Sequence, residues 1–86
     1  MSKDTKAKDL TEITGKYFYD WITQKDISEE DVANNFRIGL NSLKSTYFFK
    51  KEKLTYKQVR TILVCYPNFE IQKFGYTHSY FGFSKY

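Results

Sequence analysis

The sequence predicts a mainly α-helical domain, a compact bundle of about four helices that contains a helix-turn-helix, followed by a C-terminal aromatic β-hairpin or extended arm. Three observations support this fold class. Apolar residues recur at steps of three and four through most of residues 10–66. Ser28 and Thr55 stand where helix N-caps are expected. Aromatic and small polar residues alternate over residues 76–83, a pattern typical of strands.

The chain of 86 residues supplies one hydrophobic core, so we expect one domain with flanking segments. Residues 1–9 are polar and predict a flexible N-terminus, residues 10–68 the helical domain, and residues 69–86 the C-terminal hairpin or dimerisation arm. The first helix is expected from Leu10 to about Gln24, and Gly15 leaves open a start just after it. Its apolar stripe comprises Leu10, Ile13, Tyr17, Phe18, Trp21 and Ile22.

The second helix is expected to begin after Ser28, whose hydroxyl suits an N-cap, with Asp31 at the capping-box position. Acidic residues in its first turn favour the positive end of the helix dipole. The short segment Arg37–Gly39 then predicts a buried turn. A third helix is expected from about Leu40 to Phe49. Among its last three aromatic residues, helical spacing predicts that two enter the core and one faces outward.

A fourth helix is expected after Thr55, because Gln58 completes a capping box three residues later. Pro67 is expected to end this helix, and Cys65 to lie beside its core face as a small buried hydrophobe. The predicted core face comprises Val59, Ile62, Leu63 and Tyr66.

The last segment predicts two strands, residues 69–74 and 76–83, joined at Gly75. A two-stranded hairpin is marginal by itself, so we expect it to pack on the helices, wrap a neighbouring subunit or stay partly mobile. The residues expected at a dimer interface are Phe69, Ile71, Phe74, Tyr76, Tyr80, Phe81 and Phe83.

The net charge of +4 is unevenly distributed. Residues 27–36 carry three acids and no base, whereas residues 37–60 carry seven basic residues against Glu52 alone. The positive charge therefore begins at the predicted turn. Such clustering is typical of a phosphate-binding face, although a solvated lysine-rich surface explains it equally well.

Several classes of function are disfavoured by the residues that the chain holds. Cys65 is the one cysteine and His78 the one histidine, so neither an internal disulfide nor a four-ligand zinc site is expected. The chain has no Gly-rich phosphate loop and no nucleophile–base motif, so we expect neither an enzyme nor a cofactor. No apolar run approaches the roughly 20 residues that span a bilayer, so we expect a cytoplasmic protein without a membrane partner.

The middle of the chain resembles known DNA-binding domains. The pattern Val32-Ala33-x-x-Phe36-x-Ile38, followed by Leu43, resembles the helix-turn-helix of Cro/C1-type phage repressors. In that family an alanine sits in the first helix and hydrophobic residues follow the turn. The segment after Thr55 is similar to the helix that follows the family's recognition helix.

The turn itself departs from the family pattern. Arg37 stands where the repressors usually have glycine, and glycine appears instead at Gly39. Residues 35–43 also resemble the turn of excisionase and MerR-like winged domains. Both resemblances imply double-stranded DNA as the partner.

The resemblance implies that the third helix presents short polar and basic side chains to the major groove. An asparagine amide pairs with adenine, and a lysine with guanine or a phosphate, while Asn41 also suits a helix cap. The residues expected to contact bases are Asn41, Ser42, Lys44, Ser45 and Phe48. The residues expected to bind phosphates are Arg37, Lys50, Lys51, Lys53, Lys57 and Arg60.

We therefore expect sequence-specific binding of double-stranded DNA by a homodimeric transcriptional regulator, such as a repressor, or accessory factor of a phage, plasmid or mobile element. An alternative of a different class is a protein-interaction module, a small inhibitor or adaptor that uses the aromatic C-terminal surface. A third is single-stranded nucleic-acid binding by aromatic stacking.

Overall fold

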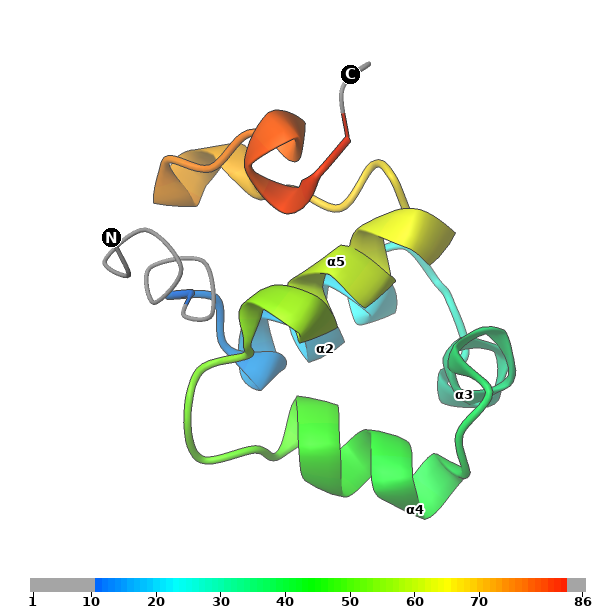
Figure 1. The fold of residues 1–86 in the computed structure, drawn as a ribbon. Coiled ribbons are helices and arrows are strands. Elements are labelled where there is room, and N and C mark those ends of the chain that lie inside the picture. The colour runs from blue at the N-terminus through cyan, green and yellow to red at the C-terminus, as the bar shows by residue number, and fades with distance from the viewer. Residues whose placement is uncertain (1–10, 84–86) are drawn as a thin grey trace.

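The computed structural model describes residues 11–83, and within them the chain is mainly helical (Figure 1). The four α-helices of this described part are α2 (Gly15–Gln24), α3 (Glu29–Phe36), α4 (Leu40–Leu43) and α5 (Tyr56–Cys65). A π-helical turn, η1 (Lys44–Phe48), continues α4 directly, and two 3₁₀ turns, η2 (Gln72–Phe74) and η3 (His78–Phe81), form the C-terminal segment. In Figure 1, α4 lies at one edge of the molecule and the C-terminal turns at the opposite edge, with α2 and α5 between them. Every helix within residues 11–83 is too short or too polar to cross a bilayer.

The first helix begins at Gly15, later than the predicted start at Leu10, which lies outside the described residues. The Thr14 side chain caps it by accepting a hydrogen bond from the Tyr17 N–H at 3.0 Å. The preceding segment is tied to the loop before α5, because the Thr11 hydroxyl and the Ile13 carbonyl both bond to the Leu54 backbone. These bonds hold residues 11–13 outside the helix.

Gly15 is needed because α2 crosses η1 in close contact. A Cβ atom at this position would lie 1.5 Å from the Tyr47 carbonyl oxygen and 3.1 Å from that of Phe48. A side chain cannot occupy that space without moving one backbone away from the other. The same glycine that weakens the helix locally thus sets its packing distance.

The second helix is confirmed with its predicted cap, since the Ser28 hydroxyl accepts the Asp31 N–H at 3.0 Å. It ends at Phe36. The C-cap residue Arg37 adopts the left-handed conformation with φ 61°, and the N–H groups of Arg37 and Ile38 bond back to α3 carbonyls. The predicted turn is therefore present. It is not buried, however, because Arg37 and Gly39 are exposed and Ile38 is half-buried.

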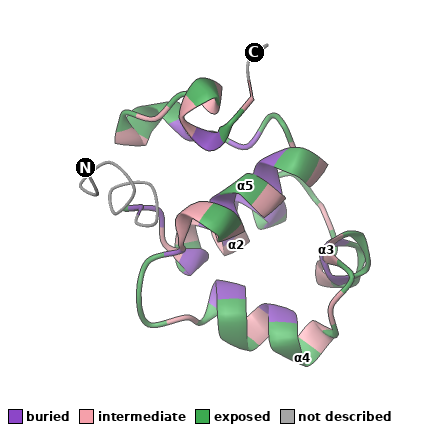
Figure 2. Cartoon of the chain, in the orientation of Figure 1, coloured by how far each residue is buried: buried purple, intermediate pink, exposed green. Residues whose placement is uncertain are grey.

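The third helix is confirmed from Leu40 but changes character at Lys44. The Phe49 N–H donates to the Lys44 carbonyl at 2.8 Å, a bond that spans five residues instead of four. The wider turn places Leu43, Tyr47 and Phe48 together against the core. Figure 2 shows that the buried side of α4–η1 faces α2 and α5.

The fourth helix is confirmed together with its capping box. The Thr55 hydroxyl accepts the Gln58 N–H at 3.2 Å, and the Gln58 side chain accepts the Thr55 N–H at 3.1 Å. α5 ends at Cys65, two residues before Pro67. Its fully buried side chains are Val59, Ile62 and Leu63, whereas Tyr66 is half-buried.

The predicted C-terminal hairpin is wrong, because residues 69–83 contain no strand. Gly75 and Gly82 each end a 3₁₀ turn with a left-handed conformation, at φ 87° and 92°. Side chains of the helices hold these turns: the Tyr17 hydroxyl donates to the Glu70 carbonyl at 2.8 Å, and Arg60 Nε to the Phe81 carbonyl at 3.0 Å. The turns therefore close over the helices.

Aromatic rings from all parts of the chain meet in one core. Phe18 of α2 lies at its centre and packs edge-on to Phe69, with ring centroids 5.5 Å apart. The Phe18 ring also meets Phe36 of α3 at 6.0 Å and Phe48 of η1 at 5.7 Å. The C-terminal segment is thus part of the core that supports α4–η1.

Candidate nucleic-acid interface

The segment α4–η1 presents one side to the core and one to solvent (Figure 2). Its exposed residues are Asn41, Ser42, Ser45 and Thr46, and Phe49 directly after it is exposed as well. α3 braces its first turn and α2 its π-helical turn. The structure therefore places three of the five predicted base-contacting residues, Asn41, Ser42 and Ser45, together on an outward face.

The polar groups of this face differ in their availability. The Asn41 amide makes no side-chain hydrogen bond within residues 11–83, and Gly39, not Asn41, holds the N-cap position of α4. The hydroxyls of Ser45 and Thr46 both donate to the Ser42 carbonyl, at 3.4 and 2.6 Å. Asn41 is thus the group on this face with the most free hydrogen-bonding capacity.

Lys44 and Phe48 differ from what the sequence predicts. The Lys44 ammonium lies 4.0 Å from a Glu29 carboxylate oxygen, so its side chain leans towards α3 in a partly exposed ion pair. Phe48 is only 3% exposed, and its prediction as a base-contacting residue is wrong. The π-helical turn exchanges the expected orientations: Phe48 enters the core and Phe49 faces solvent, with 67% of its surface exposed.

The predicted phosphate-binding residues fall into two groups. Lys50, Lys51 and Lys53 lie in the loop between η1 and α5, directly after the α4–η1 segment. The Lys50 ammonium donates to Gln58 Oε1 at 2.9 Å, and Lys51 and Lys53 are exposed. Among residues 11–83, no carboxylate lies within 4.0 Å of these three ammonium groups.

Gln58 joins the basic loop to the helical segment beside it. Besides capping α5 and accepting from Lys50, its amide Nε2 donates to the Thr46 carbonyl at 2.7 Å. One side chain therefore fixes the loop, α5 and η1 relative to one another.

The second basic group lines a groove of about 530 Å³ between α3 and α5. It consists of Arg37, Lys57 and Arg60, beside Val64, which is 59% exposed. Arg60 is engaged by the C-terminal segment, because its Nε bonds to the Phe81 carbonyl and its guanidinium lies 5.3 Å from the centre of the Phe83 ring. This arginine serves the fold, a role that no local pattern in the sequence indicates.

The predicted dimer interface is wrong for Phe69, Ile71 and Phe81, which are buried in the core of the same chain. Ring contacts within the domain also engage the remaining predicted residues, which are half-buried: Phe74, Tyr76, Tyr80 and Phe83. The aromatic side chains of residues 69–83 therefore pack mostly within the domain.

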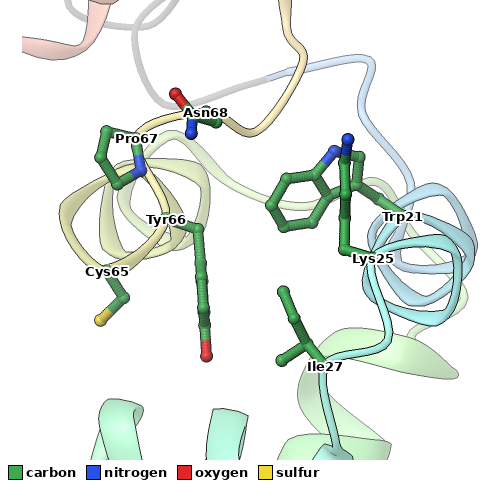
Figure 3. A pocket seen from close by; sticks show the side chains of 7 residues that line it. All are labelled: Trp21, Lys25, Ile27, Cys65, Tyr66, Pro67 and Asn68. Atoms are coloured by element: carbon green, nitrogen blue, oxygen red, sulfur yellow. The ribbon is translucent and has the colours of Figure 1, made fainter.

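A further pocket of about 340 Å³ lies between α2 and the end of α5 (Figure 3). Trp21 and Tyr66 flank it, and the Trp21 Nε1 is buried without a hydrogen-bond partner among residues 11–83. Lys25 and Asn68 also line the pocket, so it combines aromatic and aliphatic surface with polar groups. Burial raises the pKa of the Cys65 thiol at its edge, which keeps it neutral and a poor nucleophile.

Within residues 11–83, no three His, Cys, Asp or Glu side chains are grouped to hold a metal ion. Comparisons with protein-family models, with curated proteins and with solved structures gave no match for this chain.

Proposed function

We propose that this protein binds double-stranded DNA, with the exposed face of α4–η1 in the major groove and the basic loop on the phosphate backbone. The observation that carries the proposal is the outward face formed by Asn41, Ser42 and Ser45, followed in the chain by a loop that carries the exposed Lys51 and Lys53. Short polar side chains on a braced helical segment suit base edges, and lysines without carboxylate partners suit phosphates. A regulator or accessory factor of a phage, plasmid or mobile element fits this activity.

In this proposal Asn41 pairs with adenine N6 and N7, since its amide offers a donor and an acceptor together. Ser42 and Ser45 supply shorter contacts on the same face. Lys51 and Lys53 bind phosphates and fix the orientation of the helix without reading sequence. A homodimer remains part of the proposal, with an interface that excludes the buried residues of the tail.

Fluorescence anisotropy with labelled duplexes at increasing salt tests the proposal. Binding should weaken with a log–log slope of about −0.9 per phosphate contact. Lys51→Ala should weaken all duplexes alike and lower the slope by about 1. Lys73→Ala, an exposed lysine on η2 at the other edge of the molecule, is the matched control and should leave binding unchanged. Absence of duplex binding at low salt would refute the proposal.

Selection of bound duplexes from a random pool tests sequence recognition. A preferred site should emerge for the wild type, and Asn41→Ala should lose about 1–3 kcal/mol of discrimination at one position. A palindromic site would support the homodimer. An unbiased pool, recovered together with salt-sensitive binding, would leave a non-specific duplex binder.

A second candidate function is the binding of an acidic protein segment in the groove between α3 and α5. The observation that favours it is the combination of Arg37 and Lys57 with exposed Val64, in a lining that contains no carboxylate. A copolymer of glutamate and tyrosine should then bind more tightly than polyglutamate. Val64→Asp should remove that difference and leave duplex binding intact.

A further inference from the structure

Phe49 is an exception among the aromatic side chains of this protein. Of the large hydrophobic residues within positions 11–83, only Phe49 and Val64 are exposed, at 67% and 59%. The chain has sixteen phenylalanine and tyrosine residues. Within the described residues, nearly all of their rings are buried in the core or packed against it. An outward ring in such a chain calls for a physical cause and suggests a use.

The cause is the backbone of η1. The Phe49 N–H is held by the Lys44 carbonyl at 2.8 Å, so the residue is fixed at the end of the π-helical turn. That turn rotates Phe48 into the core and leaves the following ring outside. π-helical turns occur frequently at functional sites.

The exposed ring borders a hollow of about 430 Å³ between α2 and the end of η1. The Tyr19 ring lies beside Phe49, and its centroid is 6.4 Å from that of the Phe49 ring and 5.0 Å from that of the Phe48 ring. The rim is polar, since Lys16 and Asp20 form an ion pair at 3.0 Å and Lys50 closes the other side. The hollow thus combines flat aromatic surface with hydrogen-bonding groups at its edge.

The charge next to the hollow selects an anionic occupant. Lys50, Lys51 and Lys53 follow Phe49 closely in the chain with Glu52 among them, and the Asp20 carboxylate on the rim is paired with Lys16. Single-stranded nucleic-acid sites use this combination, in which cations track the backbone and an aromatic ring stacks on a base. An aromatic face accepts every base, so the contact needs no particular sequence.

We propose that Phe49, with Tyr19 beside it, stacks on an unpaired or partly unstacked nucleobase of the DNA that α4–η1 binds. The inference rests on the proposed function and adds a second mode of contact to it. Asn41, Ser42 and Ser45 contact paired bases, and Phe49 receives a base that has left the stack. The protein should accordingly prefer duplexes with a local distortion to fully paired ones.

Tryptophan fluorescence provides a direct test, because the chain has one tryptophan, Trp21, which is only 7% exposed. Phe49→Trp places an indole at the proposed stacking position, and Val64→Trp places one at the other exposed apolar site as a matched control. Each is titrated with a paired duplex, with the same duplex carrying one unpaired adenine, and with the corresponding single strand. The indole at position 49 should be quenched, most strongly by the two probes with unpaired bases, and that at position 64 should not.

Affinity measurements separate stacking from simple apolar contact. Phe49→Ala should weaken binding of the bulged duplex by about 5-fold to 150-fold, corresponding to about 1–3 kcal/mol for one stacked base. Phe49→Leu keeps apolar bulk without a ring, and it should bind the bulged duplex nearly as weakly as Phe49→Ala does. Binding of the paired duplex should change much less.

Three outcomes would overturn the inference in distinguishable ways. If all variants bind duplex normally by anisotropy and the indole at position 49 is not quenched, stacking is refuted while the proposed function stands. If no probe binds at low salt, both proposals fail. Loss of concentration-dependent self-association in Phe49→Ala, measured by light scattering without DNA, would instead make the patch an interface between copies.

Discussion

The two aromatic-rich segments of this protein use their rings in opposite ways. In the C-terminal segment, Phe69 and Phe81 are fully buried, and the backbone is held beside Phe69 by Tyr17, at the Glu70 carbonyl, and at Phe81 by Arg60. In η1, two rings enter the core, and the ring of Phe49, which caps its end, remains outside. Aromatic content therefore does not identify a binding surface. The backbone conformation around each ring decides whether it supports the fold or faces a partner.

The largest expected effect is the difference in stability between an inner and an outer phenylalanine. Phe69→Ala should lower the free energy of unfolding by about 3–5 kcal/mol, because it leaves a cavity at the centre of the core. Phe49→Ala should change it by less than about 0.5 kcal/mol, because its ring is already hydrated. Urea unfolding followed by circular dichroism measures both. Comparable losses would mean that Phe49 belongs to the core in solution.

A slightly smaller effect is expected at the crossing of α2 and η1. Gly15→Ala places a methyl group against the Tyr47 carbonyl, and relieving this overlap should cost about 1–3 kcal/mol or more. Amide chemical shifts should move along η1 and change little in η2 and η3. Gly39→Ala is a suitable control, because a Cβ there meets nothing within 4 Å among the described residues. An unperturbed η1 would contradict the close approach.

Local signals explain which parts of the fold could be predicted. Ser28, and Thr55 with Gln58, cap helices through bonds to residues only three positions away, and their helices are found where the sequence places them. Asn41, Ser42 and Ser45 lie outward for the same reason, since helical periodicity determines their side of the helix.

The errors concern features set by distant contacts or irregular turns. The spacing of Phe69 and Ile71 fits a strand, but bonds from Tyr17 and Arg60 and two left-handed glycines produce 3₁₀ turns. The exchange of Phe48 and Phe49 depends on one extra residue in a turn, which regular periodicity does not encode. The role of Arg60 requires knowing where Phe81 lies.

Gln58→Ala should have an intermediate effect, about 1–2 kcal/mol, because it removes the side chain that accepts the Thr55 N–H in the capping box of α5 and also the link to η1. DNA affinity should fall as well, since the basic loop loses its fixed position. Thr55→Ala removes only part of the cap, the hydroxyl that accepts the Gln58 N–H, and should lower stability with a smaller loss of affinity. Equal affinity losses in the two variants would show that the link from Gln58 to Thr46 has no role in positioning the loop.

Arg60→Ala tests whether this arginine serves the fold rather than phosphates. Loss of its bond to the Phe81 carbonyl should cost about 0.5–1.5 kcal/mol and increase amide hydrogen exchange in η3. Lys57→Ala, one turn earlier on α5 and exposed, should leave stability and exchange nearly unchanged. If Lys57→Ala increased amide hydrogen exchange in η3 to the same extent, the role of Arg60 in holding η3 would be refuted.

The smallest expected effect is a loss of stability at alkaline pH that depends on the inward ring of Tyr47. Burial raises the pKa of the Tyr47 hydroxyl above its ordinary value of 10.0, so the folded state holds this proton more tightly than the unfolded chain does. The stabilisation is therefore complete below pH 10 and is lost as the pH rises through the folded-state pKa. Tyr47→Phe should flatten the fall in unfolding free energy above pH 10, measured by urea unfolding at successive pH values. An unchanged slope would show that the Tyr47 hydroxyl reaches water in the folded protein, and that the π-helical turn seals this side of the core less tightly than the packing of Phe48 implies.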